Sequence, residues 1–354
     1  MLGLRGKDRL FILEYDFENY FDSIRHDYLY QILEKHFLVS DQESTLLKAF
    51  LENQRARSVA DYKNGLFETP TIGIPQGSNI SLFLANVACY ELDREVEQVG
   101  VTFARYADDS LIVCDTYEKA NTCAKLLSSH GQRSGTKINY EKSPGISLLT
   151  PDPNAEIKRK NSVDYLGHSL SPSGVAIAKT SIARMKRRCS KIIYNNLLLQ
   201  PKRGKVNQDR LGPGFHDWDL VACVNELRRY IYGRLSETAL SEVLSWQGLP
   251  KTTLCAMSFY PNVDEVGAVQ IRALDGWLVD TLLRAYAKRC QILHSLGLSP
   301  SPVSREAVIS GRWYEFDQIK VEMRLPSFYR AWLYVRKVRE AHGLGKFPSP
   351  VYEY

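Results

Sequence analysis

The sequence contains no apolar run that approaches the roughly 18 to 20 residues needed for a membrane-spanning helix. Its first residues, MLGLRGKDRL, lack the long apolar core of a signal peptide. Seven cysteines occur without any CxxC pair, which disfavours a zinc site or a disulfide framework. We also find no internal repeat or low-complexity tract. We therefore expect a globular, cytoplasmic protein with reduced thiols and no membrane partner.

The positive charge of the chain is concentrated in one segment. The net charge is +6, from 46 basic and 40 acidic residues, which by itself says little about partners. Residues 171–240, however, hold 13 Lys and Arg against 5 Asp and Glu, a net charge of +8, so the rest of the chain sums to −2. This distribution favours a polyanionic partner, with a solvated helix face as the alternative.

The order of predicted elements indicates an α+β fold of two or three domains, which 354 residues with 44% hydrophobic content can support. Strand, helix, hairpin, helix and strand in this order are typical of a ferredoxin-like antiparallel sheet with helices on one face. After it we expect basic helices from residue 177, a Pro/Gly-bearing loop at 200–214, and a helix-rich remainder over 216–354. The predicted elements of the sheet region are a strand at 10–15, helices at 23–37 and 42–53, a hairpin at 59–70 with its turn at Asn64 and Gly65, a helix from 81 to about 100, a hairpin at 103–114, a helix at 117–134, the strand TKINY, and a hairpin arm at 163–171.

Two adjacent acids, Asp108 and Asp109, interrupt the apolar stretch FARYADDSLIVC at 103–114. A buried ionised pair is costly unless it is compensated, so a solvated hairpin turn is the simplest explanation. A third acid, Asp16, ends the strand at 10–15, and in a ferredoxin-like sheet that strand lies beside the central hairpin. Three converging carboxylates would raise at least one pKa. With two Mg²⁺ about 4 Å apart they would form a clamp for phosphoryl transfer.

Five segments resemble the conserved motifs of reverse transcriptases, in the family's order and at suitable spacing. The resemblance covers about residues 10–195. It implies a right-hand polymerase: a ferredoxin-like palm with reduced fingers at 1–172, a basic helical thumb at 173–235, and an α-helical C-terminal domain at 236–354. The segments are DFENYFDSI (16–24, motif A), GIPQGSNISLFLANV (73–87, motif B), YADD (106–109, motif C), INYEKS (138–143, motif D) and YLGHSL (165–170, motif E).

The resemblance assigns roles to individual residues. Asp16, Asp108 and Asp109 would be catalytic ligands of two Mg²⁺ ions, with Mn²⁺ as an alternative metal. Phe21 would be the aromatic gate that rejects the 2′-hydroxyl of a ribonucleotide; the alternative is that it is only a core residue. Lys142 would protonate the leaving pyrophosphate; the alternative is that it is only a surface lysine. Further expected contacts are Phe17, Gln76, Gly77 and Tyr106 with the incoming nucleotide and template, and Arg184, Lys186, Arg187, Arg188 and Lys191 with nucleic-acid phosphates.

The fingers region departs from the family pattern, because only 15 residues precede Asp16. Family members usually carry basic residues there that grip the triphosphate. Other basic residues could bind the triphosphate in their place, namely Arg5 and Lys7, or Arg55 and Arg57. The alternative explanation for the short segment before Asp16 is a shortened gene start. From this pattern we expect weak dNTP binding by the chain alone. No ribonuclease H, HNH endonuclease or integrase signature follows the thumb segment.

The stretch at 259–289 resembles bacterial defence-associated reverse transcriptases of the abortive-infection branch. This implies synthesis of cDNA from a non-coding RNA template with dNTPs, in bacterial antiphage defence. Two alternatives remain open, namely template-independent, protein-primed DNA synthesis and a non-catalytic RNA-binding module. The sequence identifies neither the template, the primer nor the oligomeric state. Aromatic residues beside basic ones are candidates for stacking on unpaired bases: Trp218, Tyr230, Tyr232, Trp277 and Tyr286.

Overall fold

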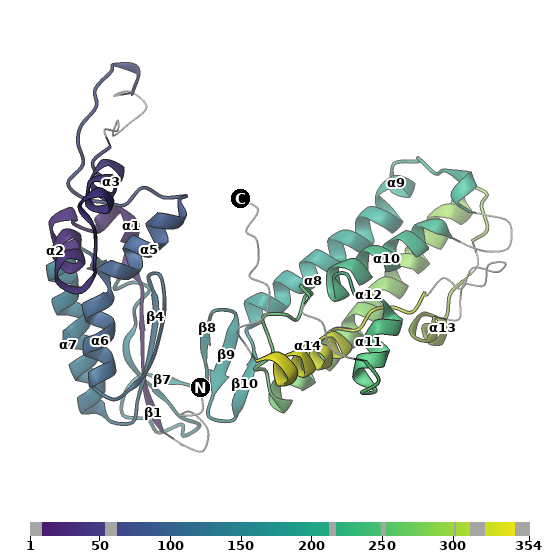
Figure 1. Cartoon of the computed structure of the whole chain (residues 1–354). Coiled ribbons are helices and arrows are strands. Elements are labelled where there is room, and N and C mark those ends of the chain that lie inside the picture. The colour runs from purple at the N-terminus through teal and green to yellow at the C-terminus, as the bar shows by residue number, and fades with distance from the viewer. Residues whose placement is uncertain are drawn as a thin grey trace. The chain divides into compact units, whose positions relative to one another are not determined.

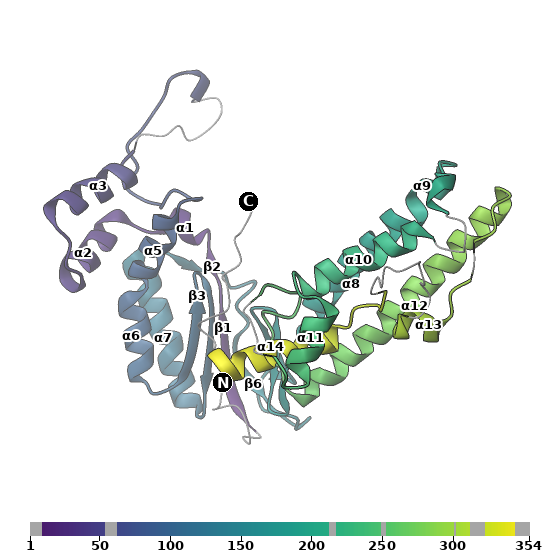
Figure 2. The ribbon, with the colours of Figure 1, turned by 45° about the vertical axis from the view of Figure 1, so that its right-hand side comes forward.

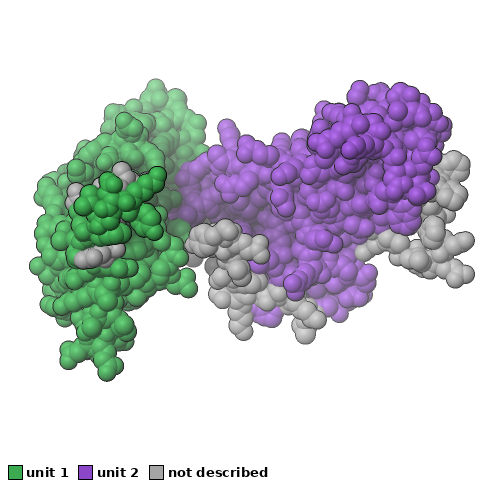
Figure 3. All heavy atoms as spheres, turned by 90° about the horizontal axis from the view of Figure 1, so that it is seen from above, with its two compact units in different colours: residues 1–163 green, residues 164–354 purple. Residues whose placement is uncertain are grey.

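The structure is a computed structural model that describes residues 9–53, 62–211, 217–248, 253–300, 302–311 and 323–343. It divides into two compact units, residues 1–163 and 164–354, which are coloured separately in Figure 3. Each unit has its own hydrophobic core. The sequence predicted a palm at 1–172, a thumb at 173–235 and a C-terminal domain at 236–354. These predicted domains are defined by their functional roles, whereas the two units are defined by compactness, so the predicted domains stay predictions.

Unit 1 is built on a five-stranded sheet in the order β3-β4-β1-β6-β7. All neighbours are antiparallel except β6 and β7. The first four strands have the ferredoxin-like arrangement expected from the sequence, with the first strand between the central hairpin and the last strand. The strands are β1 (Leu10–Tyr15), β3 (Thr102–Tyr106), β4 (Asp109–Cys114), β6 (Gly145–Leu149) and β7 (Arg159–Lys160).

Helices cover one face and one end of this sheet (Figures 1 and 2). Helices α6 (Tyr90–Gln98) and α7 (Tyr117–Ser134) pack against the strands and bury Leu92, Val96 and Leu127. Thr116 caps α7 by accepting a hydrogen bond from the Lys119 N–H. The remaining helices gather where β1 ends: α1 (Tyr20–Ser23), α2 (His26–His36), α3 (Asp41–Leu51) and α5 (Asn79–Ala88).

Three predictions about unit 1 are wrong in detail. The strand TKINY contributes only β5 (Lys137–Ile138), which pairs with β2 (Phe17–Glu18) in a separate two-stranded sheet, and the sheet's last antiparallel strand is β6. The helix expected from 81 to 100 is two helices, α5 and α6, that meet at Cys89. Asn64 and Gly65 form a turn, but no strand flanks it within residues 62–70, the described part of the expected hairpin.

Unit 2 is mainly helical and begins with a three-stranded sheet of β8 (Val163–Tyr165), β9 (His168–Ser171) and β10 (Gly174–Ile177). Asp264 joins this sheet to the longest helix, because it caps α12 and accepts a 2.8 Å hydrogen bond from the Val175 N–H. The helices form one core around α12: α8 (Lys179–Ile193), α9 (Leu199–Lys202), α10 (Trp218–Tyr232), α11 (Glu237–Leu244), α12 (Glu265–Ser295), α13 (Arg305–Ser310) and α14 (Phe328–His342).

A buried ion pair fastens α12 to the start of α10. Arg289, with 1% of its side chain exposed, donates to Asp217 over 2.6 Å and 3.1 Å and to Asp219 over 2.7 Å. It also donates to the Leu197 carbonyl over 3.1 Å. That carbonyl belongs to a π-helical turn between α8 and α9 (Tyr194–Leu198), so one side chain holds three helical segments together.

Candidate active site

The site is positioned by the ends of β1 and of the hairpin β3–β4. In the β1–β4 pairing Tyr15 is opposite Ser110, so Asp16 lies one residue beyond the last pair and beside Asp109. Tyr106 pairs with Asp109, which leaves Ala107 and Asp108 as a two-residue turn. The sheet topology thus brings the three predicted acids to one edge, as expected from the element order.

Asp108 and Asp109 lie beside other carboxylates, and this environment affects the pKa of each. Burial raises the pKa of Asp108, and the neighbouring Asp16 carboxylate, which is within hydrogen-bonding distance, raises it further. Burial likewise raises the pKa of Asp109, with added repulsion from Asp108, Asp16 and Glu14. A cluster of this kind favours a bound cation, because a cation would offset both the desolvation and the repulsion.

The fit to a metal can be judged from these donors. Carboxylate oxygens are the ligands preferred by hard divalent cations, so the donor set fits. Within the described residues, however, no three Asp, Glu, His or Cys side chains lie close enough to form a ready-made metal site. One Asp16 oxygen is instead paired with the Lys142 ammonium at 2.9 Å. A metal ion on this Asp16 oxygen would therefore compete with the Lys142 ammonium.

Lys142 is 70% exposed and is delivered to the acids by the turn after β5. The Asn139 N–H donates to the Asp16 carbonyl over 2.9 Å, and the Asp16 N–H donates to the Ser143 hydroxyl over 3.1 Å. These bonds hold the segment 139–143 against the end of β1. The hydrogen bond and charge of Asp16 raise the pKa of Lys142, so the lysine is a cation at neutral pH.

The segments of motifs A and B are hydrogen-bonded side by side. The Ile74 N–H donates to the Phe21 carbonyl over 2.6 Å, and the Gly73 N–H donates to the Ile24 carbonyl over 2.8 Å. The Gln76 amide lies 3.4 Å from the Asp22 carboxylate. The segments that carry Phe21 and Gln76 therefore lie side by side.

The remaining predicted contacts differ in their exposure. Gly77 is exposed, with a φ of +92° that favours glycine and open space where a Cβ would lie. Tyr106 is 50% exposed. Phe17 is only 3% exposed and stacks on Tyr20 at a centroid distance of 5.4 Å, so its side chain belongs to the core and not to a substrate surface. Phe21 is partly buried and packs edge-on against Tyr20.

Sequence reasoning missed Arg105, which holds the turn that carries Asp108. Its guanidinium donates to Asp93 over 2.8 Å, to Asn86 over 3.0 Å and to the Ala107 carbonyl over 2.9 Å. Ala107 has a φ of 54°, a left-handed conformation that costs about 1 kcal/mol or more for a residue other than glycine. Arg105 therefore positions the acids. The only signal in the sequence was a cationic residue in an otherwise apolar strand.

The predicted nucleic-acid contacts lie on α8 in unit 2. Four of the five residues are exposed, and Lys186 lies over the Trp277 ring at 5.3 Å from its centroid. The opposite face of α8, with Met185, Cys189 and Ile192, is buried. Of the candidate stacking residues, Tyr232 and Tyr286 are 0% and 4% exposed and so belong to the core. The candidate triphosphate contacts Arg5, Lys7, Arg55 and Arg57 lie outside the described residues.

A ferredoxin-like sheet with acids at the end of its first strand and in its central hairpin is the arrangement that the resemblance to reverse transcriptases implies for the palm. Residues 4–170 match the family model described as reverse transcriptase (RNA-dependent DNA polymerase). The chain is therefore similar to reverse transcriptase domains over just under half of its length. No curated protein sequence matches the chain.

Several solved structures match parts of the chain at low identity. Telomerase from Candida albicans, in complex with a fragment of telomeric RNA, has a TM-score of 0.37 and 14% identity over 87% of this chain and 48% of its own. Apo telomerase from Candida tropicalis has a TM-score of 0.40 and 11% identity, and the match covers 82% of this chain and 49% of the telomerase chain. A foamy viral protease-reverse transcriptase with double-stranded DNA has a TM-score of 0.32 and 10% identity over 77% and 35%. The chain thus spans half or less of each of these proteins.

Finally, no helix among the described residues is both long and apolar enough to cross a membrane.

Proposed function

We propose that the chain is an RNA-directed DNA polymerase that copies a non-coding RNA into cDNA in the bacterial cytoplasm, as part of antiphage defence. The observation that carries the polymerase assignment is the edge where Asp16, Asp108 and Asp109 meet, with the pKa of two of them raised. The defence role and the non-coding template are supported only by the resemblance of 259–289 to defence-associated relatives.

Asp16, Asp108 and Asp109 would hold two Mg²⁺, which supply a Lewis acid for the attacking 3′-hydroxyl and for the departing pyrophosphate. The hairpin β3–β4 and the guanidinium of Arg105 keep Asp108 in place beside Asp16. Phe21 would form the wall beneath the sugar of the incoming dNTP, where a 2′-hydroxyl would clash. Gln76, held near Asp22, would contact the same nucleotide from the motif B side.

Lys142 has a distinct role in this proposal. In the present structure its ammonium neutralises Asp16. Asp16 would hold a metal ion with Asp108 and Asp109, and Lys142, released from its ion pair with Asp16, would donate a proton to the leaving pyrophosphate. A lysine that is protonated at neutral pH and exposed at the surface suits this task.

The polymerase assignment is tested with the purified chain, its co-purified RNA, Mg²⁺ and labelled dNTPs. RNA-directed synthesis predicts a DNA product that disappears when the RNA is digested before the reaction. A product that forms after RNase treatment and remains attached to the protein would instead show protein-primed, template-independent synthesis. Absence of any product, with RNA still bound, would identify a binding module. Sequencing the co-purified RNA then tests the non-coding template.

A further inference from the structure

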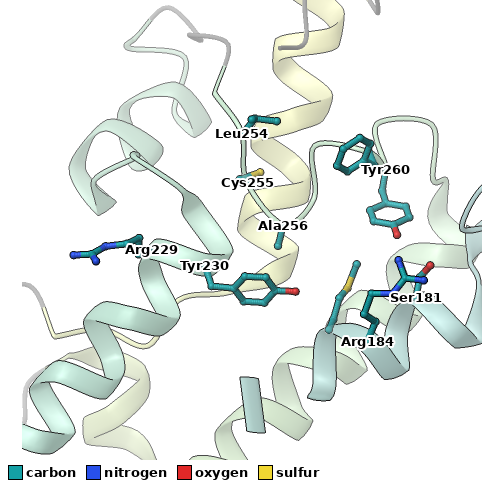
Figure 4. Close-up of a pocket in the computed structure, with 10 residues that line it drawn as sticks. Ser181, Arg184, Arg229, Tyr230, Leu254, Cys255, Ala256 and Tyr260 are labelled. Atoms are coloured by element: carbon teal, nitrogen blue, oxygen red, sulfur yellow. The ribbon is translucent and has the colours of Figure 1, made fainter. Parts of the chain in front are cut away.

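Unit 2 contains a pocket of about 470 Å³ that no motif of the polymerase uses. It lies between α8, the end of α10 and the loop 254–260 (Figure 4). Arg184 and Met185 come from α8, Tyr230 comes from α10, and Phe259 and Tyr260 come from the loop. The volume falls in the range of small-molecule sites, about 300 to 1,000 Å³.

The lining is aromatic and apolar with a polar edge. In Figure 4 the rings of Tyr230 and Tyr260 project into the space between the loop and α8. Phe259 is 54% exposed, although neighbouring positions in the loop are buried. Met185 is 6% exposed and lies on α8 at the pocket. Flat aromatic rings of this kind stack on nucleobases regardless of base identity.

One cation belongs to the same pocket. Arg184 is exposed and lines the same pocket as Tyr260 (Figure 4). Arg187, Arg188 and Lys191 on this helix are exposed cations as well. A guanidinium beside aromatic rings is suited to a phosphate next to a stacked base.

The loop that forms one wall is fixed before any ligand arrives. The Ala256 N–H donates to the Ile231 carbonyl over 3.2 Å, and the Cys255 N–H donates to the Ser258 hydroxyl over 2.8 Å. A Cβ on Gly233 would lie 1.9 Å from the Leu254 carbonyl oxygen, so the loop is seated directly on the end of α10. A preformed wall lowers the entropic cost of binding.

We propose that this pocket binds one unpaired base of a single nucleic-acid strand, with the adjacent phosphate on Arg184. The positive charge of α8 favours binding of a polyanion. The aromatic lining favours an unpaired base, because both faces of such a base are free to stack, whereas a base inside a duplex is already stacked. The inference rests on the proposed function for the presence of a nucleic acid, but not on catalysis.

The first experiment locates the base directly. Single strands of RNA and of DNA, each with one 5-iodouracil, are irradiated with the full chain without dNTPs, and crosslinked peptides are mapped by mass spectrometry. We expect crosslinks to the peptide with Phe259 and Tyr260 or to the peptide with Tyr230. The strand that crosslinks distinguishes RNA from DNA as the source. Crosslinks confined to residues outside the pocket would overturn the proposal.

The second experiment measures the dependence of affinity on the base. Fluorescence anisotropy compares a strand with an abasic strand of equal length, and stacking predicts that the wild type binds the abasic strand at least about fivefold more weakly. Phe259→Ala should reduce this ratio. Trp246→Ala, at another exposed aromatic outside the pocket, and Arg187→Gln, on the same helix, should leave the ratio unchanged.

Equal affinity of the wild type for both strands, or an unchanged ratio in Phe259→Ala, would refute the pocket assignment. Neither experiment requires synthesis. A protein that crosslinks through the pocket but makes no DNA would therefore contradict the polymerase while supporting the pocket. A protein that makes DNA but crosslinks only outside the pocket would support the polymerase assignment and contradict the pocket assignment.

Discussion

Replacing Arg105 by lysine tests whether the arginine positions the acids and does not merely stabilise the sheet. Lysine keeps the charge opposite Asp93 but lacks the planar fork that also reaches Asn86 and the Ala107 carbonyl. With two bonds from a charged donor lost, each of about 1 to 2 kcal/mol, we expect the free energy of unfolding of unit 1 to fall by about 2 to 4 kcal/mol.

The effect on catalysis should exceed this loss of stability. Without its bond to Arg105, the turn at Ala107 and Asp108 is free to relax from its left-handed conformation. A displacement of a reacting group by about 1 Å costs about 100-fold in rate, so we expect kcat to fall by roughly this factor while the Kd for RNA is unchanged. Single-turnover dNTP incorporation, at a temperature where the variant is folded, measures this.

Arg133→Lys is the matched control. Arg133 pairs with Glu95 over 2.9 Å and 3.1 Å in the same unit, but makes no contact with the turn. This variant should lose stability without losing kcat. An Arg105→Lys enzyme that is folded and retains the wild-type kcat would refute the positioning role.

Three further predictions follow from the geometry. Phe21→Ala should raise ribonucleotide incorporation relative to deoxynucleotide incorporation, measured by competing labelled NTPs against dNTPs, and unchanged discrimination would make Phe21 a core residue only. Burial, with Arg133 and Arg105 nearby, lowers the pKa of His130 to about 4. The unfolded chain therefore takes up this proton first, and stability should decline by up to about 3 kcal/mol between about pH 6.5 and pH 4. Urea unfolding of His130→Gln should show a shallower decline, and an identical pH profile would contradict the assignment. Arg289→Met leaves the Asp217 carboxylate buried without its partner, so calorimetry should show a loss of about 3 to 5 kcal/mol in unit 2. A loss below about 1 kcal/mol, typical of an exposed pair, would show that water replaces the guanidinium.

The parts of the fold set by local pattern were predictable from the sequence. Helix α7 spans Tyr117–Ser134, as its amphipathic pattern predicted. The order of elements was sufficient to place the first strand beside the central hairpin. Because strand order determines which carboxylates meet, the edge with Asp16 and Asp108 followed from the same pattern.

The errors came from long-range hydrogen bonds that periodicity does not reveal. The predicted helix at 81–100 is interrupted at Cys89, between α5 and α6. The Tyr20 hydroxyl donates a hydrogen bond to the Ala85 carbonyl, and the Cys89 N–H donates to the Asn86 carbonyl instead of to Ala85. The strand TKINY is short because the turn after β5 bonds back to Asp16. This return aligns β6 with nearly the full length of β1.

Some features of the site depend on three-dimensional contacts alone. Phe17 and Phe21 lie four residues apart in one motif, yet only the packing of Phe17 against Tyr20 and His130 shows that it is buried. The ion pair between Lys142 and Asp16 likewise joins residues 126 positions apart. Neither has a periodic or compositional signature.

The central claim is that Asp16, Asp108 and Asp109 form one catalytic centre for DNA synthesis on an RNA template. The most direct measurement is the rate of dNTP incorporation on RNA by Asp108→Asn, compared with the wild type at equal RNA occupancy. The substitution keeps the size of the side chain and removes its charge. The account predicts that incorporation is abolished while RNA binding and folding persist. Wild-type incorporation by a folded Asp108→Asn protein would contradict it.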